Sequence, residues 1–204
     1  MYIPKRFQIK DFDKIKQFID ENSFGTIISQ TENQPIATHT PMLLRKIDQQ
    51  YFVTGHMAKA NPQWKSFESL KENVLIIFQG PHTYISSSWY QVENVPTWNY
   101  QAVHIYGKIQ LMDETELAED LAILLKKYEY GRKNPVLWET LSEQTKQQIN
   151  AIVGFKVPVE EIQAAYKLSQ NRHTTDFENI IEKLSEGDEQ AQQIAKAMQE
   201  IRNK

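Results

Sequence analysis

The sequence contains no cysteine among its 204 residues. This absence excludes disulfide bonds, thiolate metal sites, iron–sulfur clusters and cysteine nucleophiles. No apolar run approaches the roughly 18–20 residues that a membrane-spanning helix needs. The first residues, MYIPKRFQIKDF, also lack the apolar core of a signal peptide. We therefore expect a cytoplasmic protein that makes no membrane contact.

Several motifs of enzyme chemistry are missing as well. The absence of G-x-G-x-x-G and G-x-x-x-x-G-K-[ST] excludes the common dinucleotide-binding and P-loop folds. The Ser86–Ser88 run has no G-x-S-x-G elbow around it, which disfavours a hydrolase. Four of the five histidines lie between residues 39 and 104, but their spacings of 17, 26 and 22 match no metal-binding motif. We expect no metal site, and the sequence identifies no catalytic residue.

The net charge of −3 comes from the end of the chain. Residues 1–159 carry 17 basic and 17 acidic side chains, whereas residues 160–204 carry 6 basic and 9 acidic ones, and 6 − 9 = −3. No basic stripe and no helix-turn-helix with a basic recognition helix is visible, and the acidic tail has the wrong sign for phosphate contact. The sequence therefore does not support direct DNA binding.

Hydrophobic spacing predicts both strands and helices. Strands are expected at residues 25–29, 36–44, 51–55, 73–79, 102–111 and 154–165. Helices are expected at residues 11–20, after Asn61-Pro62 with Trp64, Phe67 and Leu70 on one face, at 113–128 with a capping box, at 142–149, and from the caps at Thr175 and Asp188. A turn is expected at Glu32-Asn33, and residues 80–100 are interpreted as an aromatic, loop-rich segment.

These six strands do not alternate regularly with helices, which favours an antiparallel sheet over a doubly wound parallel one. Short connections between six strands further favour a closed barrel. The fold class is therefore predicted to be α+β, with an antiparallel split barrel, peripheral helices and a helical tail. We expect residues 1–173 to form the barrel domain and residues 174–204 to form a helical C-terminal extension.

One strand-to-helix junction combines groups that suit a phosphate monoester. The segment Thr54-Gly-His-Met-Ala-Lys-Ala-Asn-Pro62 places a hydroxyl, the His56 ring, the Lys59 cation and the start of a helix close together. A helix N-terminus supplies N–H donors and a lysine supplies a point charge. The alternative interpretation, a capped helix with a surface lysine, remains open from the residues alone.

The chain resembles the PaiB family of FMN-binding negative transcriptional regulators. The matching stretches are MYIPKRF, TGHMAKANPQW, GPHTYISSSWY, VPTWNYQAVHIYGK and KLSQNR, which are spread over nearly the whole chain. The resemblance implies a flavin-binding split barrel of the pyridoxamine-phosphate-oxidase class. It also implies a homodimer with FMN in a cleft between the subunits.

The resemblance also implies roles for particular residues. Thr54 and Lys59 match the threonine and basic residue that hold the FMN phosphate, with Ala58 and Ala60 where the wider class has further polar residues. Residues 38–41 would run beside the isoalloxazine ring. The cofactor-binding residues expected on these grounds are Thr38, His39, Thr40, Thr54, His56, Lys59, Asn61, Trp98 and Arg172.

Two other functions stay open at this point. One is a flavin-dependent oxidoreductase acting on a small substrate, because in flavin enzymes the cofactor performs the difficult chemistry. The other is a haem-binding or haem-degrading split barrel, since several histidines could supply an axial ligand. The segment from Val95 to Tyr100, with Pro96 and Trp98, is expected to lie near the partner subunit's cofactor.

Overall fold

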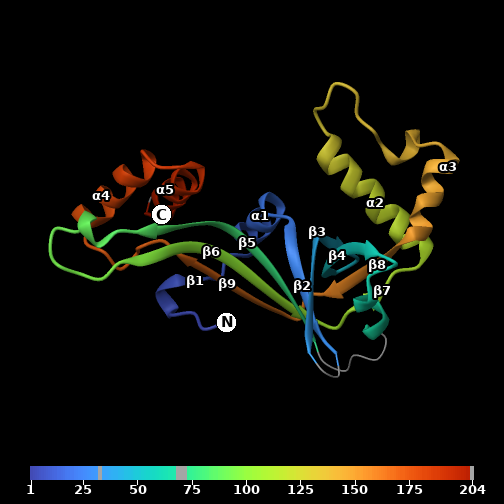
Figure 1. The fold of residues 1–204 in the computed structure, drawn as a ribbon, viewed down its shortest axis with the longest axis horizontal. Helices are drawn as coiled ribbons and strands as arrows, with labels where there is room; N and C mark the ends of the chain where they lie inside the picture. The colour runs from blue at the N-terminus through green and yellow to red at the C-terminus, as the bar shows by residue number, and fades with distance from the viewer. Residues whose placement is uncertain (32–33, 68–72, 203–204) are drawn as a thin grey trace. The chain divides into compact units, whose positions relative to one another are not determined.

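The computed structural model describes residues 1–31, 34–67 and 73–202. The predicted turn at Glu32-Asn33 and the helical position of Leu70 lie outside these residues. Figure 1 shows the strands and helices of the described chain. The strands are β1 (Gln8–Ile9), β2 (Phe24–Gln30), β3 (Pro35–Ile47), β4 (Gln50–Ala58), β5 (Val74–Ile85), β6 (Thr97–Gly107), β7 (Gln110–Leu111), β8 (Ile152–Pro158) and β9 (Glu161–Lys167).

The α-helices are α1 (Phe12–Glu21), α2 (Glu114–Glu129), α3 (Glu143–Lys146), α4 (Thr174–Ser185) and α5 (Glu189–Arg202). Short 3₁₀ helices are η1 (Lys5–Phe7), η2 (Pro62–Ser66), η3 (Ser87–Trp89), η4 (Trp138–Thr140) and η5 (Gln147–Ala151). Three predicted starts are confirmed by side-chain caps: Asp11, the Asp113/Glu116 capping box and Asp188. The predicted cap at Thr175 is wrong, because α4 already begins at Thr174 and its N-cap residue, His173, makes no side-chain cap.

The chain divides into two compact units. Unit 1 comprises residues 1–18, 79–104 and 163–204, and unit 2 comprises residues 19–78 and 105–162. The strand order is β1-β9-β6-β5 in unit 1 and β5-β2-β3-β4-β8-β7 in unit 2, and β5 and β6 run from one unit into the other. The predicted division between residues 173 and 174 stays a prediction.

The interpretation of residues 80–100 as loop-rich is wrong at both ends of that segment. β5 continues through Gly80 and Pro81 to Ile85, and β6 begins at Thr97. Glycine, proline and serine weigh against a strand as local signals, but pairing between β5 and β6 overrides them. Residues 91–96 are left as the exposed connection between η3 and β6.

The core of unit 2 lies on the inner face of β3, β4 and β8. Cross-strand neighbours share a face of a sheet, and the register places Met42 opposite Gly55 and Gly55 opposite Phe155. Each of these residues is buried, and a Cβ at Gly55 would lie 2.9 Å from both Met42 and Phe155. Glycine is therefore needed here for close packing of the sheet against its core.

Strand β3 changes partners at Pro41. Residues 35–41 pair antiparallel with β2, and residues 42–47 pair antiparallel with β4. A proline has no N–H to donate, so it is tolerated at a position where a strand leaves one ladder for the next. Residues 36–44 are predicted from the sequence to form a strand, and the observed strand includes this proline rather than ending at it.

Candidate functional site

Lys59 lies in a short loop whose backbone is held from both sides. The Lys59 N–H donates to the Ala151 carbonyl at 2.8 Å, and the Lys59 carbonyl accepts from Trp64 Nε1 at 2.9 Å. The side chain is exposed and has no ion-pair partner within the described residues. The structure thus presents one cation on an anchored backbone immediately after β4.

Within the part of the chain that the structure describes, the helix expected after Asn61 is the five-residue 3₁₀ helix η2. Asn61 caps it as predicted, because its Oδ1 accepts from the Gln63 N–H at 3.0 Å. The same side chain donates to Thr38 Oγ1 at 2.8 Å. Asn61 and Thr38 therefore tie η2 to β3, and the capped N–H of Gln63 is already used.

Gln63, which is not among the residues predicted from the sequence, is the centre of this network. Its side chain is fully buried and accepts a hydrogen bond from Thr38. Its Nε2 donates to Ser29 Oγ at 3.0 Å and to the Ile36 carbonyl at 3.1 Å. A buried amide with this many partners fixes the position of the Lys59 loop against β2 and β3. No local pattern marks it, because its partners come from two other strands.

Thr54 and His56 lie on the opposite face from the core, beneath α2. The register pairs Thr54 with Lys156 and His56 with Gly154, so these four residues share one face. Lys156 forms an ion pair with Glu116 of α2, and a Cβ at Gly154 would lie 2.9 Å from Leu117. Helix α2 therefore covers this face, in agreement with its predicted position outside the barrel.

Two buried polar atoms under α2 have no partner within the described residues: Thr54 Oγ1 and His56 Nδ1. Burial lowers the pKa of His56, and the Asp120 carboxylate of α2 raises it by a smaller amount. The ring is therefore held in its neutral form. Because Thr54 is fully buried, its hydroxyl does not reach the exposed side of the Lys59 loop.

The strand β3 places the remaining predicted residues of unit 2. His39 is exposed, its Nδ1 lies 2.8 Å from Thr26 Oγ1, and its ring stacks on Phe24 at 6.4 Å between centroids. Thr40 is buried, and its Oγ1 donates to the His56 carbonyl at 2.7 Å. Phe24 was missed by the sequence analysis, although it is 67% exposed and forms half of this ring pair.

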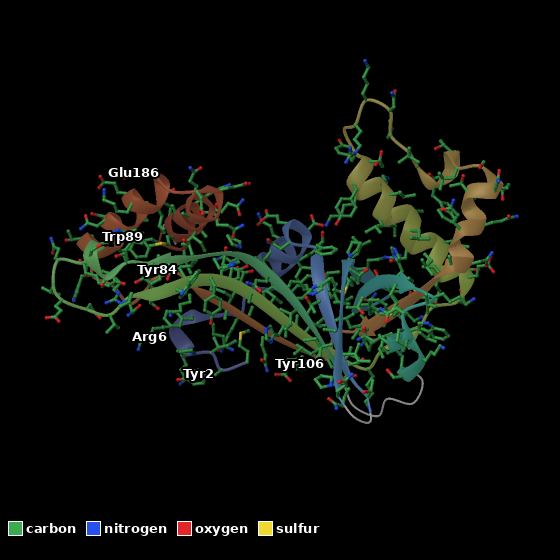
Figure 2. The ribbon with its side chains drawn as sticks, viewed as in Figure 1. Tyr2, Arg6, Tyr84, Trp89, Tyr106 and Glu186 are labelled. Atoms are coloured by element: carbon green, nitrogen blue, oxygen red, sulfur yellow. The ribbon has the colours of Figure 1, made fainter. Side chains whose placement is uncertain are left out.

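Trp98 and Arg172 belong to unit 1. Trp98 lies on β6, is 53% exposed, and contacts Tyr84 of β5, which Figure 2 labels, and His82, with ring centroids 6.0 and 6.2 Å away. Arg172 stacks on the Tyr90 ring at 4.1 Å and donates to Tyr90 Oη at 3.1 Å. The nine predicted residues thus form three groups: the Lys59 loop with β3, the face under α2, and, in unit 1, Trp98 on β6 with Arg172 between β9 and α4.

The described residues contain no cluster of three or more histidine, aspartate or glutamate side chains that could hold a metal ion. No helix among them is long and apolar enough to cross a membrane. The Lys59 cation suits the FMN phosphate. The exposed His39 and Phe24 rings suit a flat aromatic ring system. They lie on the face of β3 opposite to Thr38, whose side chain accepts from Asn61 beside the Lys59 loop.

Comparison with known proteins identifies the family to which the chain is similar. A family model described as "Putative FMN-binding domain" matches residues 1–161. The "Protease synthase and sporulation protein PAI 2" of Bacillus subtilis is 54% identical over 202 residues, which cover 98% of this chain and 97% of that protein. An uncharacterised protein of Aspergillus fumigatus is 29% identical in an alignment that covers 91% of this chain and 92% of that protein.

Solved structures show the same fold. The flavocytochrome Anf3 of Azotobacter vinelandii matches with a TM-score of 0.63 at 19% identity, and the match covers 81% of this chain and 72% of the Anf3 chain. The FAD and haem binding protein of Mycobacterium smegmatis matches with a TM-score of 0.60 at 10% identity, covering 78% and 73%. The predicted α+β class with an antiparallel split barrel is confirmed, as is FMN as the cofactor. With a family model over most of its length and a full-length relative at 54% identity, the chain belongs to the PaiB family of FMN-binding split-barrel proteins.

Proposed function

We propose that this protein is a cytoplasmic, FMN-binding homodimer that acts as a negative regulator of transcription. The observation that carries the proposal is the full-length similarity to the PAI 2 protein of Bacillus subtilis, whose name refers to protease synthesis and sporulation. Genes for protease synthesis and for sporulation are therefore the regulated class that we propose for this chain. The flavin, or a protein partner that contacts the flavin-loaded dimer, transmits the signal.

The Lys59 loop is the proposed phosphate site. An FMN phosphate carries about two negative charges near neutral pH, and a phosphate in a partly dry cleft needs a counter-charge and hydrogen-bond donors. Lys59 supplies a charge that no described carboxylate neutralises. The loop backbone, fixed by Ala151 and Trp64, keeps that charge in one place.

The half of β3 before Pro41 is the proposed flank of the isoalloxazine ring. Strand β3 pairs with β4 from Met42 onward. Residues 38–40 therefore have no pairing partner in β4. The exposed His39 ring, stacked on Phe24 of the neighbouring strand β2, offers an aromatic surface. The bound flavin supplies redox chemistry, and in this proposal the chain binds and orients it.

The half-exposed rings of unit 1 support the proposed homodimer. Tyr84 is 46% exposed, Trp98 is 53% exposed, and the neighbouring loop residues Val92 and Val95 are about 70% exposed. Aromatic residues dominate interface energetics, so an exposed cluster of this kind favours a partner surface. Light scattering at micromolar concentration should give twice the chain mass, and a monomer mass would refute the dimer.

Two measurements test the proposed function. The purified protein should show flavin absorbance at about 450 nm and no haem band at about 400 nm. Expression of this chain in Bacillus subtilis lacking its PAI 2 protein should lower protease and sporulation transcripts to the level of the parent strain. Flavin loading without any transcript change would refute the regulatory role, and NAD(P)H oxidation in its place would indicate an oxidoreductase.

A further inference from the structure

A short basic segment lies at the end of α2. Residues 126–133, KKYEYGRK, contain four cations and one acid, so their charge is 4 − 1 = +3 in a chain of net charge −3. Figure 1 shows the loop that follows α2 at the end of the helix away from β7 and β8. The balanced charge of residues 1–159 as a whole conceals this local excess.

Four residues of the segment hold it in place. Lys127 Nζ donates to the Asp20 carboxylate at 2.6 Å and lies 5.8 Å from the centre of the Tyr128 ring. Tyr128 Oη lies 2.7 Å from Ser23 Oγ. The segment is closed by Arg132 Nε donating to the Tyr128 carbonyl at 3.0 Å and by Glu129 accepting from the Val136 N–H at 3.0 Å.

The side chains of Lys126, Tyr130 and Lys133 are exposed to solvent. Tyr130 is 85% exposed. Lys126 and Lys133 are exposed and form no ion pair within the described residues. Gly131, with φ +81°, turns the backbone between Tyr130 and the final cations. One aromatic ring and two free cations are therefore displayed within eight residues.

Helix electrostatics explains only part of this arrangement. Lysines in the last turn of a helix interact favourably with its dipole, which accounts for Lys126 and Lys127. It does not account for Lys133, which follows the helix end, or for a tyrosine that leaves its ring in water. Cations that bind phosphates beside an exposed ring that stacks on a base are the usual elements of single-stranded nucleic-acid binding.

We propose that the segment from Lys126 to Lys133 binds single-stranded nucleic acid, with Lys126 and Lys133 on the phosphates and Tyr130 stacked on a base. The proposal goes beyond FMN binding and needs no flavin. With so few cations the binding is weak and salt-sensitive. It therefore does not require the strong, sequence-specific DNA binding that the sequence fails to support.

The test is fluorescence anisotropy with labelled oligonucleotides of about 20 nucleotides at about 50 and 200 mM salt. Single-stranded DNA and RNA, duplex DNA of the same length and phosphatidylserine vesicles are the four probes. We expect the single strands to bind best. Lys126→Glu/Lys133→Glu should weaken this binding at least about tenfold and reduce the salt slope by about 1.4, at roughly 0.7 per phosphate. Tyr130→Ala should weaken it about tenfold, and Tyr130→Phe should not.

The matched control makes the same charge change at two exposed lysines on other parts of the chain, Lys108→Glu/Lys196→Glu. Circular dichroism and flavin absorbance confirm that each variant is folded and loaded, so loss of flavin is distinguished from loss of nucleic-acid binding. The proposal is overturned if the parent protein binds no single strand at low salt, or if the control weakens binding as much as the test variant. Preference for duplex or vesicles overturns it as well.

Discussion

Arg45 of β3 and Asp120 of α2 form an ion pair, with 2.7 Å between Nη1 and Oδ1, although 75 residues separate them in the sequence. The Asp120 side chain is 2% exposed and the Arg45 side chain 20%. This pair fixes α2 on the same face that buries Thr54 and His56. Helix α2 is therefore held by one well-buried ion pair as well as by apolar contact through Leu117.

Asp120→Asn should lower the free energy of unfolding by about 3 kcal/mol, because it leaves the mostly buried Arg45 guanidinium without its counter-charge. The matched control is Asp20→Asn, which breaks the Lys127–Asp20 pair at a carboxylate that is 73% exposed. Exposed pairs contribute about 0–1 kcal/mol. Urea unfolding measures both, and equal losses would contradict the role given to the buried pair.

His56 should make the protein less stable in acid. Burial lowers the pKa of the folded-state ring, so below about pH 6.5 the unfolded chain binds a proton that the folded chain does not. The contribution of a neutral His56 to the free energy of unfolding is therefore fully present above that pH and is lost as the pH drops. His104 contributes in the same direction, because burial and then the N-terminal ammonium lower its pKa.

His56→Gln should reduce the difference in urea midpoint between about pH 7.5 and pH 5. His173→Gln, at an exposed histidine that makes no side-chain cap on α4, is the control and should leave that difference as it is in the parent. An unchanged difference in the His56 variant would show that other groups cause the acid sensitivity.

Lys59→Ala should weaken FMN binding about ten- to a hundredfold by removing one charge-assisted contact, and Lys59→Glu should weaken it further through repulsion. Lys65→Glu is the matched control, because Lys65 is also exposed and lies six residues further along, in η2. A flavin-fluorescence titration gives the affinities. If Lys59→Glu binds as the parent does, the phosphate site lies elsewhere, and Arg172 is the next candidate.

Gly107→Ala should be strongly destabilising, by more than about 3 kcal/mol. An added Cβ would lie 1.9 Å from the Pro158 carbonyl oxygen, which is backbone and has little freedom to move. Gly131→Ala is the comparison, because nothing lies within 4 Å of its Cβ position and only its φ of +81° is unfavourable. That strain costs about 1–2 kcal/mol. Thermal unfolding should rank the two variants in this order.

Local signals predicted those parts of the fold that depend on neighbouring residues. The Asp113/Glu116 capping box and the Asp11 and Asp188 caps are formed by residues within three positions of each other. Residues 80–85 were misinterpreted because their strand conformation depends on pairing with β6, not on local preference. In the candidate site, Asn61 could be assigned as a cap, but its bond to Thr38 could not.

The burial of Thr54 and His56 was also beyond local reasoning. Both residues lie near the end of β4 and shortly before the Lys59 loop, and the end of a strand is a usual position for an exposed binding group. Their face is covered by a helix that begins at Glu114, and nothing in the Thr54–Pro62 segment indicates that α2 returns to it. The family resemblance identified the fold and the cofactor, but it could not report which side chains remain open to solvent.

The change of partner at Pro41 has a consequence for how unit 2 opens. Strand β3 pairs with β2 before the proline and with β4 after it. Neither pairing can therefore be lost without unpairing part of β3. Hydrogen exchange should therefore give the buried amides of Ile27 in β2 and Val53 in β4 the same opening free energy, that of a single foldon. A proline that interrupts no strand thereby joins two ladders into one cooperative body.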